Sequence, residues 1–257
     1  MDGFENHFRL LAAAVALAAA PARADFKTFA HVYPYFTQPE GGKEVEIWNG
    51  VETGDLSRAG ASTLLDELAE VEYGITDHWD TSLYWRFQQA PGGPFQLDSW
   101  QLESRYRFGE KGLYPVDVEL YGELERPVDL GLPFELEGKL ILEKDAGHFI
   151  LQGNFIGEQT LATGAGLGHR LAFNGGAGYE IRPWIHLGVE ILANDAVADP
   201  LEGGGYDRTL MVGPSLSLAS SRFWFVVTPD FQIAGTSTIP EYGGAMRLRF
   251  IAGIPLD

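Results

Sequence analysis

Apolar and polar residues alternate with a period of two along most of this chain. In residues 115–126, "PVDVELYGELER", acids stand at Asp117, Glu119, Glu123 and Glu125, with aliphatic residues at most of the positions between them. Successive side chains of a β-strand point to opposite faces of the sheet. The pattern therefore predicts a strand that is carboxylate-rich on one face and aliphatic on the other.

The same alternation recurs along the chain, and helical periodicity is almost absent. Each alternating segment has about the ten residues that a tilted strand needs to cross a membrane. We expect twelve strands, at about 43–52, 65–75, 80–88, 98–108, 115–126, 134–144, 147–157, 170–181, 184–192, 207–218, 222–232 and 242–254.

The connections between these strands alternate in length. Short joins are expected at 76–79, 145–146, 182–183 and 219–221, with a somewhat longer one at 109–114. Longer joins rich in Gly and Pro lie at 88–96, 157–169 and 194–206. Short turns at one rim and long loops at the other are typical of outer-membrane barrels. We predict an all-β fold, a transmembrane antiparallel up-and-down β-barrel of about 12 strands over residues 43–257; the alternative is a secreted soluble barrel or sandwich.

The N-terminus predicts export. An apolar run, "LLAAAVALAAA", is followed by "PARA", so residues 1–24 have the pattern of a signal peptide cleaved after Ala24. The run is too short to cross a bilayer as a helix. The formal net charge of −18 belongs to the mature chain, since residues 1–24 carry balanced charges, and the chain has no cysteine. Such acidity argues against a nucleic-acid partner, and stability cannot depend on disulfides.

Residues 25–42, "DFKTFAHVYPYFTQPEGG", precede the first expected strand and are rich in aromatic residues. Pro34 and Pro39 argue against a central strand. The segment is expected to be either a plug or hydrophobic lining inside the barrel, or a periplasmic lead-in or thirteenth partial strand.

Three stretches resemble a known family of barrels. "EVEYGITDHWDTSLYWRF" (70–87), "AGYEIRPWIHLGVEI" (177–191) and "VGPSLSLASSRFWFVVTPDFQ" (212–232) are similar to hairpins of proteobacterial outer-membrane barrels classed as transporters, the group named for the MetA pathway of phenol degradation. The resemblance implies a barrel that transports aromatic or other hydrophobic solutes, and it supplies no functional residues. One departure is the C-terminus, "RFIAGIPLD", in which Phe250 stands well before the end.

The charged face of the expected strands predicts the chemistry of the lumen. The acids expected to face inward are Glu70, Glu72, Asp117, Glu119, Glu123, Glu135 and Glu137, and the expected bases are Arg105, Arg107, Arg247 and Arg249. Arg105 and Arg107 should lie beside the acids of the fifth strand, and Arg247 and Arg249 should meet Glu44 and Glu46 where the barrel closes. The surplus acid predicts a pore that favours cations. The alternative is that these charges only solvate a water-filled or plugged interior.

An enzyme is the competing class, because twelve-strand barrels that hydrolyse lipids exist. Acyl hydrolysis needs a Ser activated by a His. His169, Asn174 and His186 are candidates, but Leu171 stands where the phospholipase pattern has its serine. We therefore predict no catalytic residues.

No metal or cofactor is predicted either. Asp195, Asp199, Glu202 and Asp207 could supply oxygen ligands to Ca²⁺, but they lack the spacing of a calcium loop. The glycines of 164–168 are not followed by a helix, so a nucleotide cradle is not expected. The sequence predicts an outer-membrane channel for passive passage of small molecules, in contact with outer-membrane lipid or LPS. A closed structural or surface-interaction barrel is the alternative, and a lipid hydrolase ranks below it.

Overall fold

A computed structural model describes residues 26–54, 63–161, 168–198, 204–238 and 245–256, so the expected signal segment 1–24 lies outside the described residues. Within them no helix is long and apolar enough to cross a membrane. The described residues form twelve strands: β1 (Lys43–Thr53), β2 (Thr63–Thr76), β3 (Trp79–Gln89), β4 (Gln96–Arg107), β5 (Asp117–Pro127), β6 (Phe134–Ala146), β7 (Phe149–Leu161), β8 (His169–Arg182), β9 (Ile185–Ala198), β10 (Gly205–Ala219), β11 (Trp224–Ser237) and β12 (Met246–Leu256).

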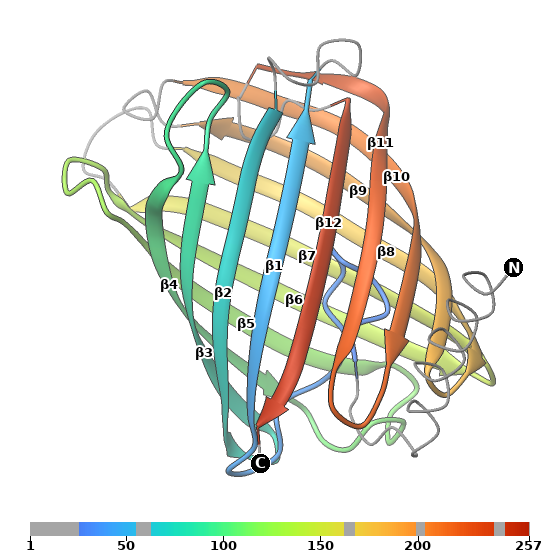
Figure 1. Cartoon of the computed structure of the whole chain (residues 1–257). Coiled ribbons are helices and arrows are strands. Elements are labelled where there is room, and N and C mark those ends of the chain that lie inside the picture. The colour runs from blue at the N-terminus through green and yellow to red at the C-terminus, as the bar shows by residue number, and fades with distance from the viewer. Residues whose placement is uncertain (1–25, 55–62, 162–167, 199–203, 239–244, 257) are drawn as a thin grey trace, which may run out of the picture.

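The strands form one closed antiparallel barrel (Figure 1). Each strand pairs with its neighbours in the sequence, and β1 also pairs with β12, from Lys43 opposite Leu256 to Thr53 opposite Met246. Closure leaves no strand edge whose backbone groups would be unpaired in lipid. The predicted fold class and the number of strands are therefore confirmed.

The turns at one rim are short except for the β4–β5 connection, residues 108–116, and β1 begins and β12 ends at that same rim. Two expected turns are displaced by one or two residues. The β6–β7 turn is Gly147–His148 and not 145–146, because Asp145 and Ala146 still pair with β7. Gly147 has a φ of 65°, a conformation that glycine adopts without steric cost. Similarly, the β8–β9 turn is 183–184 and not 182–183, because Arg182 still pairs with Ile185.

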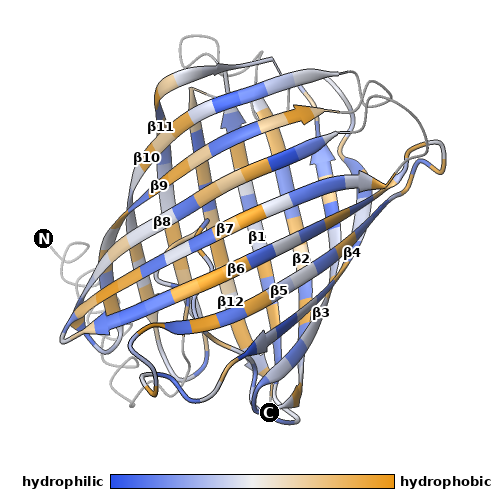
Figure 2. Ribbon diagram, turned by 180° about the vertical axis from the view of Figure 1, so that it is seen from behind, coloured by the Kyte–Doolittle hydropathy of each residue, from blue (hydrophilic) through white to orange (hydrophobic). Residues whose placement is uncertain are grey.

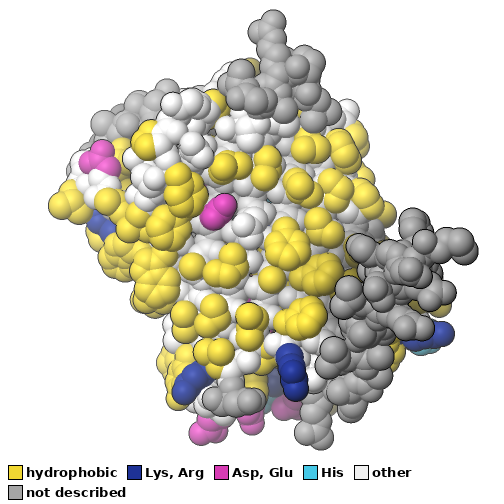
Figure 3. Space-filling view, viewed as in Figure 1, with side chains coloured by type: hydrophobic (Ala, Val, Ile, Leu, Met, Phe, Trp, Pro, Cys, Tyr) yellow, Lys and Arg dark blue, Asp and Glu magenta, His cyan; other side chains and the backbone are white. Residues whose placement is uncertain are grey.

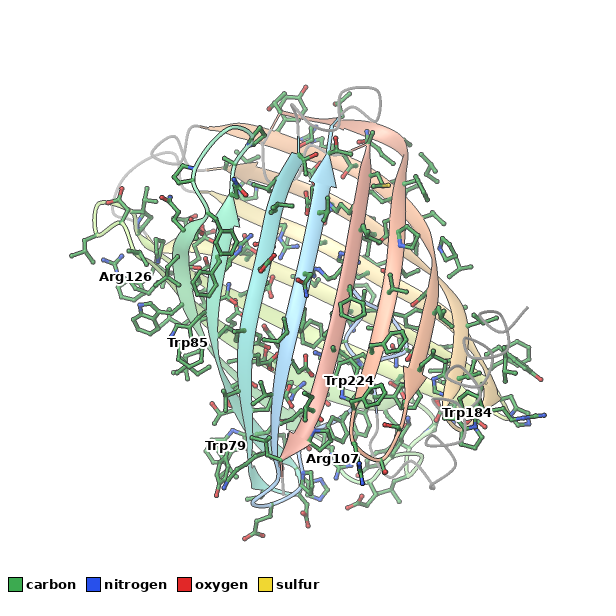
Figure 4. The ribbon with its side chains drawn as sticks, in the orientation of Figure 1. Trp79, Trp85, Arg107, Arg126, Trp184 and Trp224 are labelled. Atoms are coloured by element: carbon green, nitrogen blue, oxygen red, sulfur yellow. The ribbon has the colours of Figure 1, made fainter. Side chains whose placement is uncertain are left out.

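The outer face of the barrel is apolar. Figure 2 shows hydrophilic and hydrophobic residues alternating along the strands, and Figure 3 shows hydrophobic side chains over the outer face, with acidic and basic groups mostly near the rims. Large outward residues include Ile47, Leu102, Leu120 and Val189, all exposed. Trp79 and Trp184 lie toward the rim with the short turns (Figure 4), as expected for an interfacial aromatic belt. This surface suits a hydrocarbon environment.

The inner face carries most of the charge, and it surrounds residues 26–42, hereafter the N-terminal segment. Figure 1 shows the segment, in blue, within the ring of strands. Most of its side chains are buried, and Phe29 and Tyr35 are almost completely so. Phe26 and Ala30 of the segment share an apolar cluster with six residues of the inner wall: Trp48, Tyr84, Ala219, Trp224, Val226 and Ile251. The segment enters from the short-turn rim, where Gly41 N donates to Gly74 O.

Candidate functional site

The backbone of the N-terminal segment is held by side chains of the barrel wall. An irregular segment inside a barrel has no ladder partner, so its N–H groups need other acceptors. Five wall residues accept from five consecutive or alternate N–H groups: Glu190 from His31 (3.1 Å), Asn154 from Tyr33 (2.6 Å), Glu143 from Tyr35 (2.8 Å), Glu119 from Phe36 (2.8 Å) and Asp80 from Gln38 (2.8 Å). These acceptors come from five different strands, so the segment is fixed from several sides.

Lys27 anchors the start of the segment. Its Nζ donates to Glu46 Oε2 at 2.6 Å and lies 4.1 Å from the centre of the Trp48 ring. Burial lowers the pKa of Lys27, but the negative charges of Glu46, Glu70 and Glu72 outweigh it and raise that pKa overall. Lys27 therefore places a basic group among the inward acids of β1 and β2.

The Phe29 ring packs against two glycines of the barrel wall, Gly176 and Gly188, which have no side chains. A Cβ at Gly176 or at Gly188 would lie 2.5 Å from the Phe29 ring. The ring is fully buried. Such a close approach of ring to backbone is possible only at glycine. Gly176 on β8 and Gly188 on β9 therefore leave the room that the docked segment needs.

We expect G176A to destabilise the docked segment, because the three atoms nearest to the new methyl group all belong to the Phe29 ring, at 2.5–2.7 Å. Overpacking of this kind costs about 1–3 kcal/mol. Unfolding in detergent should show that loss, and conductance should rise. In G122A the new Cβ has open space, so that control should match the wild type. In an F29A background, which already lacks the packing of the buried ring, the further change G176A should cost little stability, because the ring that the new methyl group would meet is absent. Equal behaviour of G176A and G122A would contradict the close packing of Phe29 on this glycine.

Arg105 is the centre of a buried ion network at the same end of the lumen. Its guanidinium lies 2.7 Å from Asp80, 2.9 Å from Glu72 and 3.0 Å from Glu103. Gln38 of the segment donates to Glu72 and to Asp80 as well. The arginine therefore holds together three carboxylates, two of which also bind the segment.

The predicted lumen residues divide into two groups. Glu70, Glu72, Asp117, Glu119 and Arg105 are buried in the half of the lumen that holds the segment.

Glu123, Glu135, Glu137, Arg247 and Arg249 line cavities on the side of the long loops. Arg107 lies at the short-turn rim (Figure 4), where it donates to the carbonyl of Asp77. The expected sites therefore lie at different depths: the first group is buried beside the segment, the second lines the cavities, and Arg107 is partly exposed at the rim.

Two expected pairings are wrong. Arg247 pairs with Glu52, at 3.3 Å, and Arg249 lies 4.0 Å from Asp66. The antiparallel register places Glu46 opposite Gly253, far along β12 from both arginines. Glu46 instead binds Lys27.

Arg105 and Arg107 lie beside β5 as expected, and Arg107 is opposite Glu119 in the register. The close ion-pair partners of Arg105, however, lie on β2, β3 and its own strand. The reason is that a strand has two neighbours, and the sequence pattern does not choose between them.

Two adjoining cavities occupy the loop side of the lumen. The outer one has a volume of about 640 Å³ and the inner one about 190 Å³. Both are lined by the same five residues: Arg86, Glu125, Glu135, Glu158 and Arg170. The inner cavity ends at His31 and Tyr33 of the segment. Together the two cavities extend from the loop side of the described residues to the segment.

Charged pairs surround these cavities. Arg86 lies 2.8 Å from Asp66, and Arg170 lies 2.7 Å from Glu158 and also contacts Glu137. Among the described lining residues, nine are acidic and five are Lys or Arg: Glu52, Asp66, Asp98, Glu123, Glu125, Asp129, Glu135, Glu137 and Glu158 against Arg86, Lys139, Arg170, Arg247 and Arg249. Acidic side chains therefore outnumber basic ones on the described cavity walls, even after each base is paired with one acid.

The histidines considered for catalysis have other surroundings. His186 lies 3.0 Å from Thr28, nitrogen to hydroxyl, and its ring stacks on Phe26. Leu171 points outward and is exposed. In the calcium-loop candidate, Asp195 lies 3.1 Å from Arg208, and residues 199 and 202 lie outside the described part of the chain.

Sequence reasoning missed the residues that hold the segment. Asn154, Asn174 and Glu190 are inward and buried, and Asn174 donates to the carbonyl of His31. Polar residues at single inward positions have no distinctive spacing. The available signal was Lys27 and His31 in an otherwise aromatic segment, because buried charges need partners on the wall.

The closed barrel, its apolar outer face and its charged, partly filled lumen define a bacterial outer-membrane β-barrel protein. No protein-family profile matches the chain, and no curated protein matches it.

Among solved structures, the chain is similar to the COG4313 outer membrane channel from Pseudomonas putida F1, with 11% identity, 88% of this chain and 100% of the other covered, and a TM-score of 0.60. It is also similar to the NanC porin, with 10% identity, 82% and 100% covered, and a TM-score of 0.56. At such identities the likeness concerns the fold.

Proposed function

We propose that this protein is an outer-membrane channel for passive passage of small molecules. The observation that carries the proposal is the pair of adjoining cavities that leads from the long loops to the N-terminal segment. Both similar structures with this fold bear the name of a channel or a porin. In this proposal the N-terminal segment is a plug that narrows the passage at its short-turn end.

The lining favours particular solutes. Nine acids against five bases in the described lining support a preference for cations. Tyr33, Trp48 and Tyr121 line the inner cavity and offer aromatic surfaces. This fits the resemblance to the MetA phenol-degradation group, from which aromatic or other hydrophobic solutes are the proposed substrates. Contact with LPS in the outer leaflet is part of the same proposal.

A closed structural barrel is the second candidate, and the N-terminal segment favours it. The segment is buried and is bonded to the wall at several points. A barrel closed in this way would show no conductance. Lipid hydrolysis lacks a comparable observation, since His186 contacts a threonine and a phenylalanine of the segment.

The test is conductance of the refolded barrel in a planar bilayer under a salt gradient. The wild type should show stable steps and a cation-selective reversal potential. In E125Q/E135Q, two acids that line both cavities lose their charge, so the cation-to-anion permeability ratio should fall roughly twofold.

D195N is the matched control, because Asp195 is exposed near the rim beside Arg208, outside these cavities. It should leave the reversal potential unchanged. An equal effect of D195N and E125Q/E135Q would refute the role of the cavity acids. A silent wild-type barrel would favour the closed structural barrel.

A further inference from the structure

One cluster of ligand-type side chains joins the N-terminal segment to the wall. His31 comes from the segment, Glu190 from β9 and Asp230 from β11. His31 Nδ1 lies 2.8 Å from Glu190 Oε1 and 3.0 Å from Asp230 Oδ2. All three side chains are buried, and both carboxylates are fully so. The cluster therefore brings one imidazole nitrogen and two carboxylates to one point.

Protein hydrogen bonds alone do not satisfy this cluster. A single Nδ1–H points toward one acceptor, and Glu190 also accepts from His31 N. Neither oxygen of Asp230 has a hydrogen-bond donor in suitable geometry among the described residues. A fully buried carboxylate without a well-placed donor is costly, so a cation bound at this point would stabilise Asp230, whose nearest positive group is the His31 imidazole at 3.0 Å.

The neighbouring arginines are engaged elsewhere or stand further away. Arg247 is opposite Asp230 in the strand register, but its guanidinium lies 3.3 Å from Glu52. Arg249 acts on His31 only through its charge, and its nearest carboxylate contact is Asp66 at 4.0 Å. A divalent cation with a neutral imidazole would make the three-residue cluster neutral, whereas a protonated imidazole leaves one negative charge.

The three donor atoms lie near the separations of a metal site. Bonds of about 2.0–2.2 Å at the tetrahedral angle put two ligand atoms roughly 3.4 Å apart, so the 2.8 and 3.0 Å separations found here would widen by about 0.5 Å around a bound ion. One imidazole with two carboxylates is a donor set for Zn²⁺ or a similar divalent transition metal. His31 also lines the inner cavity, which supplies a path of entry from the loop side.

A second acidic cluster provides a contrast. Glu44, Glu46 and Glu72 also lie close together and buried. However, Trp224 donates to Glu44, and Lys27 pairs with Glu46. Arg105 pairs with Glu72. These carboxylates already have donors and positive charges, so this cluster carries no metal proposal.

We propose that His31, Glu190 and Asp230 bind a divalent transition-metal ion of the Zn²⁺ class, which ties the N-terminal segment to β9 and β11. Three protein ligands leave positions for water in the inner cavity. The metal site does not depend on which solute the channel passes. We expect the bound metal to hold the N-terminal segment in its docked position.

The test is calorimetric titration of ZnCl₂ into the folded, metal-stripped barrel in detergent, purified without a polyhistidine tag. The wild type should show a single tight site. D230N keeps the shape of the side chain but removes the charged ligand, so Kd should rise at least about tenfold. H31Q should do the same.

His148 lies 3.4 Å from Glu180 at the exposed short-turn rim, so H148Q is the control for surface binding. It should leave the wild-type Kd unchanged. Zinc-edge X-ray absorption of the wild type should show one nitrogen and two carboxylate ligands. Absence of Zn²⁺ binding, or the same Kd in D230N and wild type, would overturn the proposal.

Discussion

Removing residues 26–38 is expected to raise single-channel conductance at least about threefold. A twelve-strand barrel is narrow enough for one segment to fill a large part of its lumen, and these residues occupy the half below the two cavities. The acceptors that they leave behind, including Glu119 and Glu143, are carboxylates that water can solvate. Gly41 and its bond to Gly74 remain.

Planar-bilayer recordings of the deletion variant would measure this change, with heat-modifiable migration to show that the barrel folds. Y33A is a smaller change in the same direction, because the Tyr33 ring lies at the base of the inner cavity beside Tyr121. H148Q, in the short β6–β7 turn, should conduct as the wild type does. Unchanged conductance in both the deletion variant and Y33A would show that the segment does not limit the passage.

Replacement of Arg105 by alanine should cause the largest loss of stability. The side chain is buried and lies within 3.0 Å of Glu72, Asp80 and Glu103. Removal of one partner leaves buried charges without compensation, which costs about 3–5 kcal/mol. Urea unfolding of the barrel in detergent should show a loss of this size, and the N-terminal segment should loosen because Gln38 binds two of the same carboxylates.

Arg107 provides the matched control, two residues further along the same strand and face. It is partly exposed, lies 3.6 Å from the exposed Glu110, and donates to a carbonyl at the rim. Ion pairs of this kind contribute about 0–1 kcal/mol, so R107A should unfold almost as the wild type does. If the two alanine variants lost the same stability, the buried network would not be the source of the effect.

Much of the fold could be predicted because the alternation is strong. In β5 the inward Asp117 and Glu119 and the outward Leu120 follow the period of two without interruption. The turns were predicted less well, since the pairing that extends β6 to Ala146 depends on β7 and not on local residues. The partner of Arg247 likewise depended on the pairing of β1 with β12, which places Glu52 opposite it.

The candidate site was predicted only in its general character. Acids such as Glu135 and Glu137 were expected in the lumen, and both line a cavity. Which acids bind the segment and which face open space depends on the depth that residues 26–42 reach. Gly176 and Asn174 gained their importance from Phe29 and His31, which are distant in the sequence.

The sequence by itself determined a closed antiparallel barrel with an apolar outside, because the period of strand alternation and the lengths of the connections are local properties of the chain. Only the tertiary structure decided how the lumen is divided. The joining of Glu190 and Asp230 to His31 requires three segments to meet, and such contacts follow from closure, register and burial, which no local pattern encodes.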